Sequence, residues 1–203
     1  VSRIDRSYQS WLLQLQTWAA DGRFFSAGVD ALRLKLGQAT DQLKHIANRL
    51  AKGETRDLPS IEVLPGSAMP GAAGAYASSD NTIYLNANWL KSASNDQVIA
   101  LLNEEFGHHL DAQLNNSDTA GDEGELFAIL LSKETLESLN SDQLKAIRTE
   151  QDQGFIETPG GRKSVEFAVI TGTNTAETLT GTADADTITG GNEGKHADGD
   201  TIY

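Results

Sequence analysis

The sequence predicts an α+β fold, in which a helix-rich domain with a small antiparallel sheet is followed by the start of a parallel β-roll. Apolar residues recur at helical spacing over residues 7–52 and again over 94–114. Alternating segments surround two turns, and the last part of the chain repeats every nine residues. We therefore divide the chain into a domain of residues 1–170 and a repeat segment of residues 171–203.

The composition excludes several kinds of protein. The 203 residues carry a formal net charge of −13, so the chain lacks the basic stripe that neutralises nucleic-acid phosphates. Cysteine is absent, which excludes disulfides and thiolate metal sites. No apolar run reaches the roughly 18 residues that a membrane span requires. An acidic, oxygen-rich surface is better suited to binding divalent cations than to binding nucleic acid.

The elements before the central helix follow from periodicity and breakers. Residues 7–52 read as helical with a break at Asp21-Gly22, and Trp11 and Trp18 are assigned to the core. A short strand is predicted at 61–64. Two hairpins are predicted, one over 75–85 with its turn at Ser78–Asn81, and one that joins Phe155-Ile156 to Val165–Val169 through Pro159-Gly160-Gly161.

The helix over 94–114 is the most informative element. Ser94 or Asn95 caps it, and a four-spaced apolar ladder covers one side: Val98, Leu102, Phe106, Leu110 and Leu114. Glu104, His108 and Asp111 project from the opposite side. A further helix is predicted from residue 122 to about Leu131, then two short helical stretches to about Gln151, the second capped by Ser141.

Glu104-Glu105-Phe106-Gly107-His108 is the zinc-protease HExxH motif with glutamate in place of the first histidine. Ligands four apart on a helix converge on one ion from adjacent turns, which assigns Glu104 and His108 to the metal. Glu105 then flanks the same cavity, where its carboxylate can polarise metal-bound water. Gly107 allows another segment to pack closely beside the site.

The remaining ligand must come from another element. Glu123 or Glu125 in the next helix is expected to supply it, and Asp111 is expected to orient His108 as a second-shell partner or to act as a ligand. The ion would be Zn²⁺ or another divalent transition metal, held less selectively than by histidines because carboxylates are harder ligands. The alternative is that these residues form an ordinary solvated helix face.

The order of hairpin, short connection and acid–histidine helix resembles the zincin fold of metallopeptidases. The resemblance implies that Glu105 is the catalytic glutamate, that His108 is the second ligand, and that Glu123 or Glu125 takes the place of the gluzincin glutamate. It also implies that Thr82, Ile83 and Tyr84 form an edge strand that pairs with extended substrate. More narrowly, Asn81–Leu85, the EExxH segment, Asp111 and Gly121–Gly124 resemble a domain found beside RTX repeats in secreted bacterial, especially cyanobacterial, proteins.

The segment 172–203 resembles the RTX (hemolysin-type) nonapeptide repeat. Two units starting at Gly172 and Gly181 keep one register, with an acid at position six, threonine at seven and an aliphatic residue at eight. The resemblance implies a parallel β-roll with Ca²⁺ between successive coils, at Asp184, Asp186, Asp198 and Asp200. Glu177 stands where aspartate is usual, and an acidic disordered tail is the alternative.

Two functions remain open at this point. The first is a secreted metal-dependent peptidase that hydrolyses peptide bonds with metal-activated water, exported by type I secretion and joined to further RTX repeats. The second is a non-catalytic pseudo-zincin module that serves folding, display or tethering of a secreted calcium-binding protein. Self-processing by the same site is a third possibility. A peptide or protein substrate is expected if the domain is active, and nucleic acid and a membrane span are excluded under all three.

Overall fold

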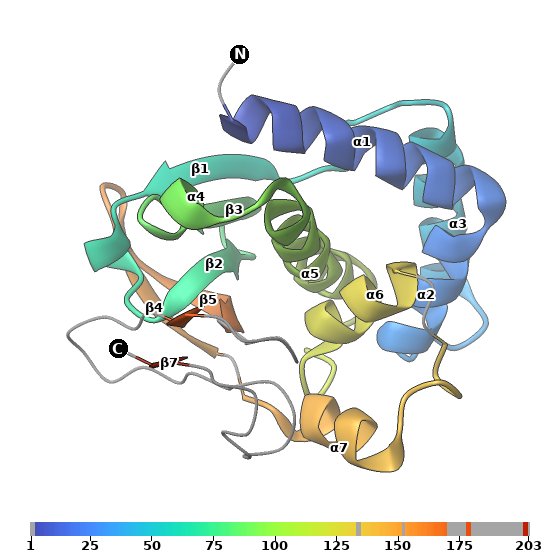
Figure 1. Cartoon of the computed structure of the whole chain (residues 1–203). Helices are drawn as coiled ribbons and strands as arrows, with labels where there is room; N and C mark the ends of the chain where they lie inside the picture. The colour runs from blue at the N-terminus through green and yellow to red at the C-terminus, as the bar shows by residue number, and fades with distance from the viewer. Residues whose placement is uncertain (1–2, 133–134, 152, 170–177, 180–200, 203) are drawn as a thin grey trace.

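The computed structural model describes residues 3–132, 135–151, 153–169, 178–179 and 201–202 (Figure 1). It confirms the α+β class, with a five-stranded sheet at one side and most of the helices gathered at the other. None of the helices in these described ranges combines the length and the apolarity that a membrane crossing requires.

The helical prediction for residues 7–52 is confirmed as three helices, α1 (Arg3–Asp21), α2 (Arg23–Ala31) and α3 (Gln38–Ala51). Gly22 separates α1 from α2 with a φ of 90°, a backbone conformation that favours glycine. Trp11 is fully buried, and half-buried Trp18 packs against the same core. The Trp11 indole donates a hydrogen bond of 2.8 Å to the Asn103 side chain, which ties α1 to the central helix.

The sheet has the order β1-β3-β2-β5-β4. Its strands are β1 (Ser60–Leu64), β2 (Ala72–Ala77), β3 (Thr82–Asn86), β4 (Gln153–Thr158) and β5 (Gly161–Val169). Both predicted hairpins are present, as β2–β3 and β4–β5. The sheet is mixed rather than purely antiparallel, because β1, which the short helix η1 (Gly66–Ala68) follows in the chain, pairs in parallel with the side of β3 away from β2.

The assignment of Thr82, Ile83 and Tyr84 to a substrate-binding edge strand is wrong. β3 forms hydrogen-bonded ladders with β1 on one side and with β2 on the other, so its backbone groups are already used. The edges of this sheet are β1 and β4. The hairpin partner of β3, β2, follows from the local turn in the sequence. Its parallel partner, β1, is not joined to it by a turn, so local sequence patterns do not reveal this pairing.

The central helix α5 (Asn95–Leu114) forms as predicted. Ser94 caps it in a reciprocal capping box with Gln97. All five residues of the apolar ladder are buried, and Phe106 meets Trp11, Phe24 and Phe127 in an aromatic core. The short helix α4 (Trp89–Ser92) connects β3 to α5.

Helix α6 (Glu123–Leu131) crosses α5 at very short range. A Cβ placed on Gly107 of α5 would lie 2.6 Å from the Cα of Gly124 in α6, closer than real Cβ contacts come. The predicted role of Gly107 is therefore confirmed. Helix α7 (Ser141–Thr149) follows and is capped by Asn140, one residue before the predicted cap at Ser141.

His109 of α5 is a core residue that joins the helix to two other segments. Its Nε2 lies 2.8 Å from the carbonyl oxygen of Asp57, and its Nδ1 lies 3.3 Å from the hydroxyl of Tyr76. A neutral ring that donates from Nε2 and accepts at Nδ1 satisfies both contacts. Burial lowers the pKa of His109 to about 4, so the ring is uncharged at neutral pH.

The repeat segment is described only at two short strands, β6 (Thr178–Leu179) and β7 (Thr201–Ile202), which pair in parallel. Asp184, Asp186, Asp198 and Asp200 lie outside the described residues. The calcium sites therefore stay a prediction.

Replacing Gly107 with alanine is expected to destabilise the fold. The new methyl group collides with the backbone of α6, and overpacking of this kind costs roughly 1–3 kcal/mol even though alanine favours the helix. Gly28→Ala is the matched control, because its Cβ would meet only the flexible end of Leu43. Denaturant unfolding measures both, and equal stability of the two variants would contradict the close crossing.

The uncharged state of His109 predicts a specific dependence of stability on pH. Because the folded pKa, about 4, lies below the usual 6.5, the unfolded chain takes up the proton first. The contribution of His109 to stability is therefore complete above pH 6.5 and is lost as the pH falls toward 4, by of order 3 kcal/mol. The measurement is the difference in unfolding free energy between the wild type and His109→Gln across this range, and a difference that does not change with pH would refute it.

Candidate metal centre

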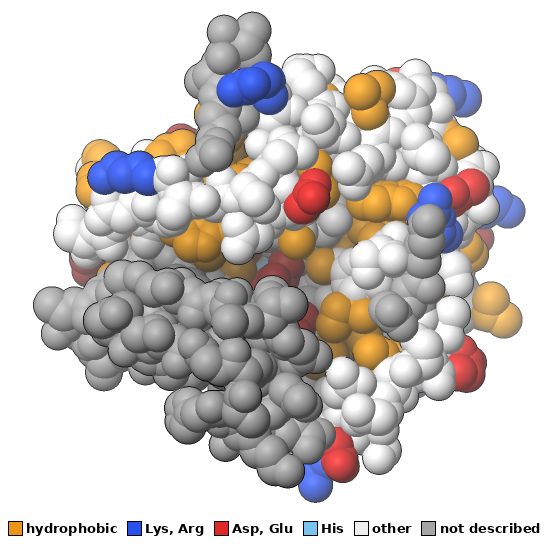
Figure 2. Space-filling model, viewed as in Figure 1, with side chains coloured by type: hydrophobic (Ala, Val, Ile, Leu, Met, Phe, Trp, Pro, Cys, Tyr) orange, Lys and Arg blue, Asp and Glu red, His pale blue; other side chains and the backbone are white. Residues whose placement is uncertain are grey.

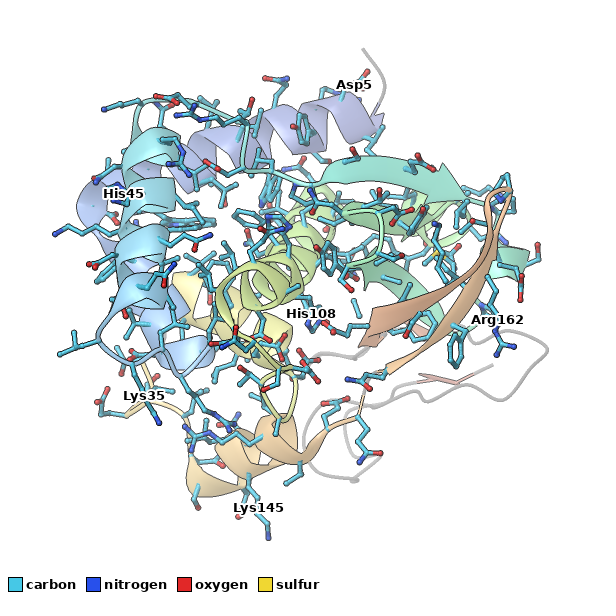
Figure 3. All side chains as sticks on the ribbon, turned by 180° about the vertical axis from the view of Figure 1, so that it is seen from behind. Asp5, Lys35, His45, His108, Lys145 and Arg162 are labelled. Carbon is cyan, nitrogen blue, oxygen red and sulfur yellow. The ribbon has the colours of Figure 1, made fainter. Side chains whose placement is uncertain are left out.

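Acidic side chains from four segments surround His108. Glu104, Glu105 and His108 itself come from α5, and Glu166 comes from β5. The others lie at the start of α6 and just after α7: Asp122, Glu123, Glu125 and Glu150. Figure 3 places His108 between α5 and the strand β5, and Figure 2 shows acidic side chains recessed in the middle of one face. The alternative of an ordinary solvated helix face is wrong for Glu105 and His108, because both side chains are fully buried. Glu123 of α6, which contacts His108, is nearly as buried.

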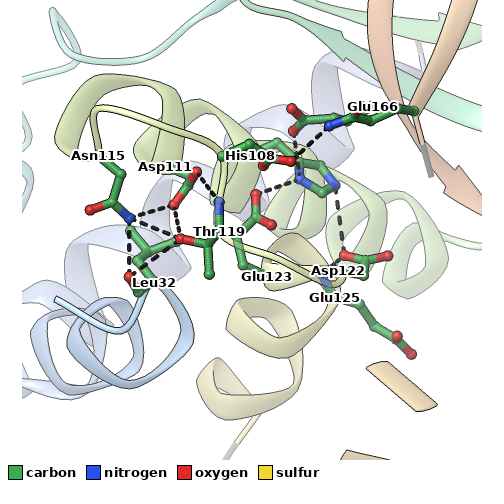
Figure 4. Close-up of polar contacts among 11 residues, drawn as sticks. Leu32, His108, Asp111, Asn115, Thr119, Asp122, Glu123, Glu125 and Glu166 are labelled. Carbon is green, nitrogen blue, oxygen red and sulfur yellow. Dashed lines mark hydrogen bonds and ion pairs between the residues drawn. The ribbon is translucent and has the colours of Figure 1, made fainter. Parts of the chain in front are cut away.

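Carboxylates lie against both ring nitrogens of His108 (Figure 4). Nδ1 is 2.9 Å from Glu123 Oε1 and 2.9 Å from Glu166 Oε2. Nε2 is 3.7 Å from Asp122 Oδ1. Burial by itself would lower the pKa of His108, but the hydrogen bonds to Glu123 and Glu166 outweigh it and raise the pKa well above its usual value. The carboxylates around the ring therefore favour its protonated form.

The neighbouring carboxyl groups are strongly perturbed. Burial raises the pKa of Glu123 to about 7 against the opposing effect of His108. Burial also raises the pKa of Glu125 to about 7, and the charges of Asp122 and Glu150 add to it. So many buried carboxylates repel one another, which favours either protons or a cation among them.

Glu105, the predicted catalytic residue, lies between α5 and the sheet. Its Oε1 is close to Gly74 of β2, where a Cβ would come within 2.8 Å. Burial raises the pKa of Glu105 well above its usual value, and the charge on His108 and the Ala168 amide oppose this. A carboxyl group of this kind is suited to exchanging a proton.

Glu104 is half-buried, and its carboxyl interacts electrostatically with Asp122 and Glu125 of the α6 segment. The pKa of Glu104 is raised well above its usual value. Burial is the largest cause, and the charges of Asp122 and Glu105 add to it. Within the described residues, Glu104 is not in any of the groups whose possible ligand atoms all lie within 4.8 Å of one another. The predicted pair of Glu104 and His108 therefore shares a neighbourhood without forming a compact ligand group.

Asp111 holds the loop that carries α6. Its carboxylate accepts hydrogen bonds from the Asn115 amide, the Thr119 backbone and the Thr119 hydroxyl, at 2.6–3.0 Å. Asp111 was expected to orient His108. The carboxylates that contact Nδ1 of His108 belong to Glu123 and Glu166 instead. Asp111 acts on the centre through the position of this loop.

Three groups of side chains have possible ligand atoms within 4.8 Å of one another in the described ranges. They are His108 with Glu123 and Glu166, Asp111 with Asp118 and Glu123, and Asp122 with Glu125 and Glu150. These buried histidine and carboxylate groups could hold a metal ion. Of the residues in these groups, sequence reasoning named His108, Asp111, Glu123 and Glu125, and it missed Asp118, Asp122, Glu150 and Glu166. Asp122 adjoins the predicted ligands, whereas nothing in the local pattern marks Glu150 or Glu166.

Comparison with known proteins adds no identification. No family model matches the sequence, and comparison with the curated proteins and with the solved structures gives no match.

Proposed function

We propose that this domain is a metal-dependent peptidase whose divalent ion binds at His108. The observation that carries the proposal is the buried imidazole with a carboxylate against each of its nitrogens. Nitrogen and oxygen donors in this arrangement suit Zn²⁺ or another divalent transition metal. Bound there, the ion would supply Lewis acidity toward a substrate carbonyl and would acidify water.

Glu105 is the proposed general base and acid. It follows the first ligand position of the EExxH motif, and its buried carboxyl has a pKa well above that of an ordinary glutamate. A raised pKa lets the group take a proton from water and return it to the leaving amine near neutral pH. The contact with Gly74 fixes its position against the sheet.

An extended substrate would pair with β4 rather than with β3. β4 is an edge of the sheet, and its first residue, Gln153, stands opposite Glu166 in the β4–β5 ladder. The free edge of β4 therefore begins beside the proposed centre. A peptide that adds to this edge would run past the ion.

The burial of the centre favours a second candidate function. His108 and Glu105 are both fully buried, as is usual for an ion that stabilises a fold. In this case the domain would be a non-catalytic pseudo-zincin that helps to fold, display or tether a secreted protein. The RTX-like repeats of residues 171–203 support secretion and Ca²⁺ binding under either proposal.

Metal content tests the centre. The purified protein is expected to hold a stoichiometric divalent transition metal, and His108→Ala should lose it because the only buried imidazole at the described centre is removed. His45→Ala is the control, since His45 is an exposed residue of α3. Elemental analysis after dialysis gives the answer. Equal metal content in the two variants would count against the proposal.

Peptide hydrolysis separates the two candidate functions. A peptidase should cleave a peptide library in a way that a chelator abolishes and added metal restores. Glu105→Gln should lower kcat by at least about a hundredfold with metal content unchanged, because general acid–base catalysis contributes 10²–10⁴. Metal-dependent thermal stability without any cleavage would instead support the non-catalytic module.

A further inference from the structure

The two nitrogens of His108 have carboxylate contacts of different length. At Nδ1 both contacts measure 2.9 Å, which is within the range of roughly 2.7–3.2 Å for a hydrogen bond from an N–H group. At Nε2 the contact with Asp122 Oδ1 measures 3.7 Å, which is longer than this range. Two ligands of one tetrahedral ion, each about 2.0–2.2 Å from it, stand roughly 3.3–3.6 Å apart. The distance of 3.7 Å between Nε2 and Asp122 Oδ1 is closer to this ligand–ligand spacing than to a hydrogen bond.

A further group of carboxylates begins at Asp122, the residue whose Oδ1 lies nearest to Nε2. Asp122, Glu125 and Glu150 offer oxygens within 4.8 Å of one another, from the cap of α6, its first turn and the end of α7. Asp122 already accepts a hydrogen bond of 2.6 Å from the Glu125 backbone amide, which fixes its carboxylate. Glu125 and Glu150 are half-buried, so this side also communicates with solvent.

Gly124 packs closely against the Nε2 side of the ring. A Cβ at this position would lie 2.6 Å from His108 Nε2 and 2.6 Å from the carbonyl oxygen of Glu104. Any other residue would therefore place its side chain against the nitrogen that faces Asp122. Glu104 belongs to the same neighbourhood, since the charges of Asp122 and Glu125 both raise its pKa.

We propose that the ion binds His108 through Nε2 and is completed by Asp122, Glu125 and Glu150, whereas Glu123 and Glu166 hold the Nδ1–H. This inference rests on the proposed function only in that an ion binds at His108. It makes Glu123 and Glu166 positioning residues, which fix the tautomer and the ring orientation. It also assigns the centre an oxygen-rich ligand set with an accessible side, from which water or a substrate can approach.

Nitrogen NMR of the histidine side chains tests the inference on the full chain, with Zn²⁺ as the probe. On Zn²⁺ addition, the Nε2 resonance of His108 should shift to that of a metal-bound nitrogen, while Nδ1 keeps its proton. In Glu166→Gln the Nδ1–H resonance should move, and the Nε2–metal signature should remain. Loss of the Nδ1 proton on Zn²⁺ binding would overturn the proposal.

Zn²⁺ affinity gives a second, independent readout. Glu150→Gln and Glu125→Gln should each weaken binding by at least about tenfold, because each removes a charged ligand. Glu157→Gln, in an exposed position of β4, is the matched control and should bind Zn²⁺ like the wild type. Unchanged affinity in both ligand variants would overturn the proposal.

The outcomes distinguish this inference from the proposed function. Zn²⁺ bound through Nε2 without peptide hydrolysis supports the inference and rejects the peptidase. Hydrolysis with Zn²⁺ bound through Nδ1 supports the peptidase and rejects the inference. A wild-type chain that binds no Zn²⁺ rejects both.

Discussion

The centre around His108 depends on the close crossing of α5 and α6. Gly107 and Gly124 meet where any larger residue would force the helices apart, so the backbone of α6 begins directly beside the motif helix. This distance brings Asp122 and Glu123 to opposite nitrogens of one imidazole. A separation greater by one side chain would break both contacts at once, and the carboxylates of α6 would then face solvent or one another.

Two supports hold this crossing in place. On the α6 side, Asp111 accepts the hydrogen bonds of Asn115 and Thr119, which shape the loop between the helices. The Asp122 amide donates to the Ile147 carbonyl, and Gly121 allows the same loop to approach the backbone of Arg148 in α7. On the α5 side, the apolar ladder and His109 fix the helix against α1 and the sheet. The polar centre is thus built on ordinary core packing.

Local patterns predicted the parts of the structure that local physics determines. The helix cap, predicted at Ser94 or Asn95 and found at Ser94, the ladder of α5 and the turns of both hairpins are encoded by neighbouring residues, and each formed as expected. Glu166 could not be predicted, because it joins the centre only through the position of β5 beside β2. The same reason explains the error about β3, whose parallel partner β1 is specified by long-range pairing. Residue spacing identified α5 as the helix that carries the centre, whereas the contribution of Glu166 depends on how the strands are arranged in the sheet.

The place of β5 in the sheet has a mechanical consequence. This strand is bonded to β2 on one side and to β4 on the other. A pull along β5 would load two hydrogen-bond ladders together, whereas an edge strand would separate from a single neighbour. Glu166, only three residues from the end of β5, also couples the strand to the imidazole of α5. Separating β5 from the sheet would therefore also break a contact of the buried centre.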